Sequence, residues 1–182
     1  LTISSFFDIN TWKILYDSGF IIKKIIGIIF GNFKRIRDLY LIKKFDIVYI
    51  FMWVTPLGST IFEHLFVKFS KKIIYDFNDS IYLKDHHTEK FIINHFFNFL
   101  KTPNKCIYLI KNSNHVIIDS LFHYNYCHNL NKYNSCTHIP CSLDVNYFYP
   151  INKKRSNGEI IRIGWTGTFS SKIYLDNIKN VF

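Results

Sequence analysis

The chain has 182 residues, of which 48% are hydrophobic, and a formal net charge of +10. This length and hydrophobic content allow one ordinary globular domain with a sizeable core and argue against a disordered chain. The positive charge favours anionic partners in general. The lysine excess, however, comes with the Ile, Lys, Asn, Phe and Tyr bias that is typical of AT-rich genomes. Because the sequence contains no nucleic-acid-reading motif, we expect no specific nucleic-acid binding.

The first predicted element is a basic helix from Ile21 to Lys43. Its most apolar stretch, Phe20 to Phe30, is interrupted by Lys23 and Lys24 and is too short to span a bilayer. No signal peptide is evident, so we expect a cytoplasmic protein, either soluble or peripheral on the inner face of the membrane. Two interpretations of the helix stay open: a basic amphipathic surface on an anionic membrane, or a sheet-covering helix with a solvated Lys/Arg face, which we favour.

Short apolar runs alternate with helical stretches along the rest of the chain. The runs predict strands covered on both faces and are Ile47 to Phe51, Lys72 to Tyr75, His115 to Ile118, Thr137 to Ile139 and Ile160 to Gly164. The helical stretches are Ser59 to Phe69, Thr88 to Leu100 and Ser120 to Lys132. This alternation predicts an α/β fold in which flanking helices cover a Rossmann-like parallel sheet.

Helix-capping signals follow several of the predicted strands. Thr60 and Glu63 have the spacing of a capping box, which makes Glu63 a helix cap rather than a catalyst. Ser120 is a second candidate cap, after Asp119, and the segment from Thr168 to Ser171 is a third. In a doubly wound sheet these carboxyl-end turns are where ligands bind.

The four cysteines lack the paired spacing of a disulfide framework, which with no secretion signal favours free thiols in a reducing compartment. Three histidines lie among them, which suggests a zinc site, but there is no C-x-x-C pair and we expect no metal. The residues concerned are Cys106, Cys127, Cys136, Cys141, His123, His128 and His138. His86, His87 and His115 are interpreted as loop or edge residues.

A change in composition between Pro140 and Glu159 predicts an exposed linker. The expected organisation is therefore an N-terminal Rossmann-like domain over 1–139, a linker over 140–159, and the first strand and helix of a second Rossmann-like domain over 160–182. The chain opens on Leu1 and stops at Phe182, within a helix expected to begin after Ser170 or Ser171, so we expect it to be truncated at both ends.

Six segments, taken in order, resemble motifs of GT4-type (group 1) glycosyltransferases. They are Lys44 to Ile50 ("YDVV"), Pro56 to Glu63 ("PLG...E"), Lys72 to Tyr82 ("YDxDD"), Val116 to Ser120 ("VIxxS"), His138 to Pro150 ("IPxxxDxxxFxP"), and Ile163 to Thr168 with Tyr174 and Leu175 ("IGWxGS...YL"). Each motif is weak alone, and the ordered set is more specific. Asn78 departs from the pattern, because the family has an acidic residue there.

The resemblance implies a GT-B fold, with an acceptor-side N-terminal domain that lacks its first strand and the beginning of a nucleotide-sugar domain. It implies transfer of a sugar from a nucleotide-diphosphate sugar to a glycan or lipid-linked acceptor, for example in polysaccharide biosynthesis, without a metal or other cofactor. Because the family's E-x7-E motif is not reached, we expect these 182 residues to be inactive alone.

The resemblance places Asp76 and Asp79 at a strand end that faces the interdomain cleft. A carboxylate there could orient or deprotonate an acceptor hydroxyl, so both are catalytic candidates. The structural alternative is that Asp79 caps a helix and Asp76 forms a turn. Asn78 and Ser120 are candidates for the acceptor side of the cleft, although capping also explains Ser120.

The candidate donor site is the strand-to-helix turn that contains Gly164, Gly167, Thr168 and Ser170. Gly167 would let the backbone approach a phosphate closely, and Thr168 or Ser170 could donate a hydrogen bond beside the positive end of the next helix. The alternative is an ordinary tight turn.

Two other functions stay open. One is a non-catalytic Rossmann-like binding module. The other is a basic protein that binds nucleic acid or a membrane surface, with the early basic helix as the membrane contact.

Overall fold

The computed structural model describes residues 1–15, 17–78 and 104–149, together with Gly164, Leu175 and Ile178. The chain divides into two compact units, Leu1–Ser142 and Leu143–Phe182. All helices and strands whose bounds are defined lie in the first unit. The helix predicted over Thr88 to Leu100 and most of the strand predicted to end at Gly164 fall outside the described residues.

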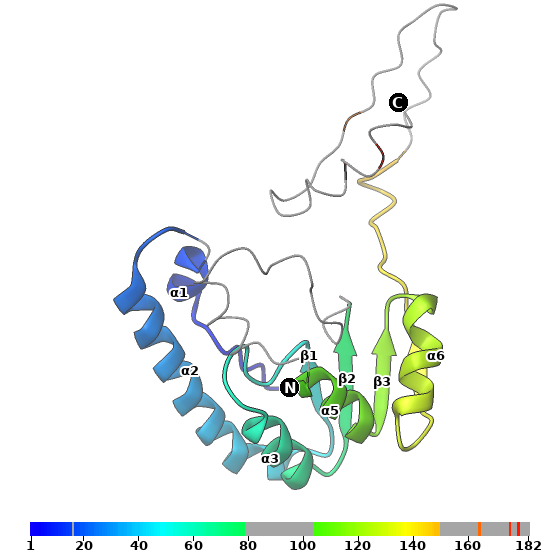
Figure 1. Cartoon of the computed structure of the whole chain (residues 1–182), viewed down its shortest axis with the longest axis horizontal. Helices are drawn as coiled ribbons and strands as arrows, with labels where there is room; N and C mark the ends of the chain where they lie inside the picture. Colours follow the sequence, from blue (N-terminus) through cyan, green and yellow to red (C-terminus); the bar gives the residue numbers. More distant parts are fainter. Residues whose placement is uncertain (16, 79–103, 150–163, 165–174, 176–177, 179–182) are drawn as a thin grey trace, which may run out of the picture. The chain divides into compact units, whose positions relative to one another are not determined.

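The first unit contains a four-stranded parallel sheet, whose labelled strands lie side by side in Figure 1. Its strands, in spatial and chain order, are β1 (Val48–Phe51), β2 (Ile73–Phe77), β3 (His115–Ile118) and β4 (Cys136–His138). Each neighbouring pair is parallel. The prediction of an α/β fold with a Rossmann-like parallel sheet is therefore confirmed.

Helices connect these strands and precede them. In chain order they are α1 (Ile9–Ile14), α2 (Ile21–Leu41), the 3-10 helix η1 (Ile42–Lys44), α3 (Ile61–Phe69), α5 (Asn104–Asn112) and α6 (Leu121–Leu130). The predictions of α2, α3 and α6 are confirmed within a few residues at each end. Helices α1 and α5, which have only 6 and 9 residues, are not among the predicted elements.

The core lies on one face of the sheet, where inward residues of β1, β2 and β3 meet residues of α3, α5 and α6. It is built from Ile42, Ile50, Val54, Phe66, Ile73, Tyr75, Phe77, Cys106, Leu109, Ile110, Val116, Ile118 and Cys127. Between the inward positions, Tyr49 and Phe51 are 56% and 54% exposed. Burial thus alternates along the strands, and the outward positions of β2 and β3 are half-buried. Among the described residues, the prediction that both faces are covered is wrong for β1.

The strand order gives the physical reason. Strands that follow one another without a reversal, joined by right-handed crossovers, place every crossover helix on the same side of the sheet. The contacts of α3 with α5 and of α5 with α6 agree with one continuous layer.

Helix α2 packs differently from the prediction. It contacts α1, η1 and α3, and its buried residues are Gly27, Gly31, Arg35 and Asp38. A Cβ atom at Gly31 would lie 2.6 Å from the ring of Phe6, so glycine permits this close approach. The prediction of a sheet-covering helix with a solvated Lys/Arg face is wrong, because most of the exposed positions carry Ile or Phe.

The segment from Pro140 to Tyr149 is exposed and forms neither helix nor strand, as predicted for this part of the linker. Asp144 organises a turn in it, since its side chain accepts a hydrogen bond from the amide of Asn146 and its carbonyl accepts one from Phe148. Leu175 and Ile178 are helical. The placement of the domain boundary stays a prediction. None of the helices that the structure describes is long and apolar enough to cross a bilayer.

Candidate functional site at the carboxyl edge of the sheet

The carboxyl ends of the parallel strands form one edge, where the residues after each strand come together. Beyond β1, the amide of Met52 donates to the carbonyl of Asp76 over 2.9 Å, and beyond β4 the amide of Ile139 donates to the carbonyl of Ile118 over 2.8 Å. Phe77 is in register with Ile118, so Asn78 and Asp119 follow on neighbouring strands. This is the edge at which open parallel sheets bind ligands.

Asp76 lies inside β2, with its side chain on the face opposite the core. The hydroxyl of Tyr49 on β1 donates a hydrogen bond to its Oδ2 atom. Among the described residues, no hydrogen bond reaches the other oxygen, Oδ1. The interpretation of Asp76 as a turn former is wrong, because β2 continues to Phe77 through its pairing with β3.

Tyr49 fixes the orientation of this carboxylate. Partial burial, together with the hydrogen bond to Asp76 and the negative charge there, raises the pKa of Tyr49 to about 12. The phenol therefore stays protonated at neutral pH and serves as a donor. Within the part of the chain that the structure describes, one oxygen of Asp76 is held by Tyr49 and the other accepts no hydrogen bond.

The remaining acceptor-side candidates differ in their surroundings. Asn78 is exposed directly after β2, where its amide can reach a ligand at the edge. Ser120 caps α6, since its Oγ accepts a hydrogen bond from the amide of Phe122 over 3.2 Å, which confirms the predicted cap. Asp79 lies outside the described residues.

Asp119 is a further carboxylate at this edge, where the sequence predicts only a helix cap. Its Oδ1 atom is buried without a hydrogen-bond partner among the described residues, and its Oδ2 lies 4.0 Å from the thiol of Cys141. Its carbonyl lies 3.0 Å from Nε2 of His138, so His138 must carry its proton on that nitrogen. The signal in the sequence is an aspartate directly after an apolar run, a pattern that Asp76 shares after the run predicted to end at Tyr75.

The loop after β1 is held by two buried cations from different helices. Arg35 of α2 donates from Nε to the carbonyl of Val54 over 2.6 Å. Lys105 of α5 donates from Nζ to the carbonyls of Thr55 and Leu57, both over 2.9 Å. Backbone carbonyls of the loop thus accept hydrogen bonds from both cations. These bonds fix the loop after β1 in place at the carboxyl edge of the sheet.

Glu63 supplies the charge that balances Lys105. Glu63 is 0% exposed and Lys105 is 1% exposed, with 3.8 Å between Oε1 and Nζ. Oε1 also accepts hydrogen bonds from the amide and hydroxyl of Thr55, each over 3.2 Å. Burial lowers the pKa of Lys105, and the carboxylate of Glu63 opposes that shift.

The capping-box prediction is therefore wrong. Thr60 precedes α3, but its side chain makes no capping hydrogen bond. Glu63 turns into the core instead, because a buried ammonium group without a counter-charge would be strongly destabilising.

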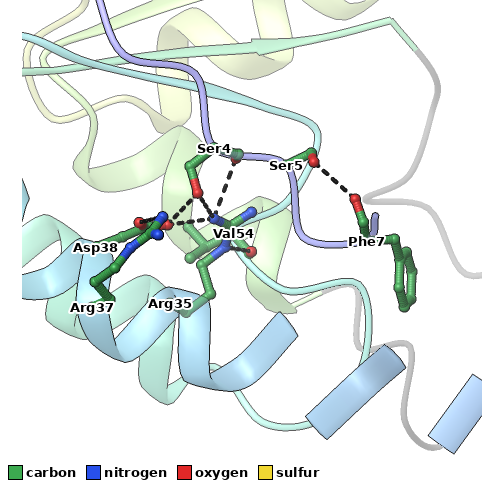
Figure 2. A network of polar contacts seen from close by, with 7 residues as sticks. All are labelled: Ser4, Ser5, Phe7, Arg35, Arg37, Asp38 and Val54. Carbon is green, nitrogen blue, oxygen red and sulfur yellow. Dashed lines mark hydrogen bonds and ion pairs between the residues drawn. The ribbon is translucent and has the colours of Figure 1, made fainter. Parts of the chain in front are cut away.

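Arg35, the other buried cation, belongs to a polar network that includes the N-terminal segment (Figure 2). Arg35 Nη1 lies 2.7 Å from Asp38 Oδ2, and Ser4 Oγ donates to the same oxygen over 2.6 Å. Burial pushes the pKa of Asp38 upward, but hydrogen bonds from Ser4, Arg35 and Arg37 outweigh it and lower the pKa.

The donor-side candidates belong to the second unit. Gly164 is exposed, and a Cβ added there would meet no atom within 4 Å, so no close approach of the described residues requires a glycine at that position. Gly167, Thr168 and Ser170 lie outside the described residues, and their roles stay predictions.

The buried thiols are poor nucleophiles. All four cysteines are free. Burial raises the pKa of Cys106 and of Cys127 to about 12. Within the described residues, no three His, Cys, Asp or Glu side chains are grouped so that they could hold a metal ion.

No protein-family model matches the chain, and neither a curated protein nor a solved structure matches it. The resemblance to glycosyltransferases therefore depends on the motif residues themselves.

Proposed function

We propose that this chain is the acceptor-side part of a GT-B glycosyltransferase, which transfers a sugar from a nucleotide-diphosphate sugar to a glycan or lipid-linked acceptor. The ordered motifs support this proposal, and so does a parallel sheet whose polar residues gather at the carboxyl edge. The observation that carries it is the pair of Tyr49 and Asp76, an oriented carboxylate whose second oxygen accepts no hydrogen bond from the described residues.

The chemistry requires an acceptor hydroxyl to be held and deprotonated as the sugar is transferred. In our proposal, Asp76 Oδ1 accepts the hydrogen bond of that hydroxyl while Tyr49 holds Oδ2. The exposed amide of Asn78 would bind a neighbouring hydroxyl of the acceptor. Asp79 stays the second candidate for the base.

The leaving diphosphate would be bound by the turn from Gly164 to Ser170. Backbone amides and the positive end of a helix stabilise such a charge without a divalent cation. This role is proposed from the resemblance and from the residue types in the turn.

Nuclear magnetic resonance of the isotope-labelled chain tests the proposal by binding rather than by turnover. We expect glycan acceptors to shift the amide signals of Asn78 and Ser120, and UDP- or GDP-sugars to shift those of Gly164 and Gly167. A chain whose signals at both places stay unchanged with every donor and acceptor in a broad panel does not have this function. Shifts caused only by duplex DNA would favour the nucleic-acid alternative.

The variant Asp76→Asn separates a catalytic carboxylate from a general binding surface. A carboxylate accepts a stronger hydrogen bond than a neutral amide does, so we expect the affinity of Asp76→Asn for glycans to be about tenfold lower. Tyr49→Phe is the matched control that keeps the charge and frees Oδ2. An unchanged affinity in Asp76→Asn would remove Asp76 from the site.

A non-catalytic binding module is the second candidate function. Asn78 favours it, because this amide stands where the glycosyltransferase motif has an acidic residue. Sugar transfer by the full-length parent protein that survives Asn78→Ala but not Asp76→Asn would contradict this second function.

A further inference from the structure

We propose that the exposed face of α2 lies on the surface of an anionic lipid bilayer. This inference goes beyond the proposed glycosyl transfer and does not depend on it. It starts from the inverted burial of α2, in which the small and charged residues Gly27, Gly31, Arg35 and Asp38 face the protein.

The outward face of α2 is apolar. Eight large side chains on it are each at least 45% exposed: Ile22, Ile25, Ile26, Ile29, Phe30, Phe33, Ile36 and Tyr40. Their spacing of three, four and seven positions places them in one stripe along the helix. With 21 residues, the helix is about 30 Å long, so the stripe forms a continuous patch of the kind that marks an interaction surface.

Positive charge lies beside the stripe. Lys23 and Arg37 are exposed and Lys34 is partly exposed, and their spacing of eleven and three positions puts them along one edge of the stripe. The one acidic residue within α2 is Asp38, which is buried and paired with Arg35 and, at its other oxygen, with the exposed Arg37. The outward surface of the helix therefore joins an apolar stripe to a row of cations, as in helices that lie in the membrane interface.

Charge also distinguishes between two partners that could cover the apolar stripe, a second copy of the chain and a lipid surface. Against a second copy of the chain packed antiparallel, the stripes would bring two rows of lysine and arginine close together, which costs energy in a poorly solvated interface. Anionic headgroups meet the same row with opposite charge, and each cation near such a surface strengthens binding. The lipid surface is therefore the better complement.

The polar network on the other side fixes which face of α2 points outward. Arg35 is bonded to Val54 and Asp38, and Asp38 to Ser4, so rotating the helix would break buried hydrogen bonds (Figure 2). Gly31 packs against Phe6 at a distance that leaves no room for a larger residue. The apolar stripe is thus held outward by the fold.

Flotation of the 182-residue chain with vesicles tests this inference. We expect binding to equimolar phosphatidylcholine and phosphatidylglycerol, weaker binding at high salt, and little binding to phosphatidylcholine alone. The double variant Ile29→Asn with Phe33→Ser should reduce binding at least tenfold, because it removes two apolar contacts. The matched control is Leu121→Asn with Phe122→Ser, which changes two apolar residues of α6 that are 67% and 79% exposed. This control variant should bind vesicles as the unmodified chain does.

A charge variant tests the cationic edge separately. Lys23→Gln, Lys34→Gln and Arg37→Gln together should weaken binding to the mixed vesicles about a hundredfold. The control changes three exposed lysines elsewhere, Lys68, Lys111 and Lys132, to glutamine. Circular dichroism confirms that each variant is folded.

Three results would overturn the inference. The first is absence of binding to the mixed vesicles by the folded chain. The second is binding that the α2 variants and the α6 control reduce equally. The third is self-association in sedimentation that Ile29→Asn with Phe33→Ser abolishes in the absence of lipid binding, which would assign the stripe to a second copy.

Discussion

The buried pair of Glu63 and Lys105 allows a quantitative prediction. In Glu63→Gln, the ammonium keeps its hydrogen bonds to the carbonyls of Thr55 and Leu57 but loses the carboxylate 3.8 Å away. At an effective dielectric constant of about 20, that attraction amounts to about 4 kcal/mol. We therefore expect the free energy of unfolding to fall by about 3–4 kcal/mol, a large part of the stability of a domain this size.

Urea unfolding, followed by circular dichroism, measures this loss at neutral pH. The double variant Glu63→Gln with Lys105→Met should recover most of the stability, since an apolar side chain can replace a buried ion pair with little loss. Should Glu63→Gln lose less than about 1 kcal/mol, or the double variant be no more stable than the single one, the pair would not be electrostatically coupled as described.

The pH dependence of the single variant gives an independent check. The folded pKa of Lys105 is below its unfolded value of 10.5, so the unfolded chain binds more protons and this group makes stability rise with pH up to that value. Without Glu63 the folded pKa falls further. The stability difference between Glu63→Gln and the unmodified chain should therefore shrink as the pH is raised from 7 towards 10.

Two further predictions concern the packing of α2 and the buried thiols. Gly31→Ala should destabilise the chain by about 1–3 kcal/mol in urea unfolding, because the added Cβ would lie 2.6 Å from the Phe6 ring, while Gly164→Ala meets no atom and should change little. Burial raises the pKa of Cys106 and Cys127 from the ordinary thiol value of 9.0 to about 12, so the folded state binds more protons and stability should be lost as the pH rises above 9. Replacing both by serine should flatten that loss in unfolding curves recorded from pH 8 to 11, and an equally steep loss would contradict the assignment.

The strands could be predicted from the sequence because local composition determines them. The runs around Ile50, Ile74 and Val116 are continuous in β-branched and apolar residues, and each became a strand within two residues of the expected ends. Ser120 could be predicted as a cap for a similar reason, since the cap bonds only to its own helix.

Long-range contacts explain what the sequence analysis missed. Glu63 has the local spacing of a capping box, but its partner Lys105 lies on α5, a helix that the sequence pattern does not predict. The strand around Asp76 extends to Phe77 because of its register with β3, which composition does not reveal. The burial of Arg35 in place of the isoleucines of α2 depends on the carbonyl of Val54 and on Ser4, both distant in sequence.

The loop after β1 has its carbonyls tied on one side to Arg35 and on the other to Lys105. Moving this loop would remove carbonyl hydrogen bonds from two buried cations, so the free chain already holds the shape that a ligand would meet. Little conformational entropy would then be lost on association, and ligands are expected to be selected by their fit to a preorganised surface rather than by loop closure around them.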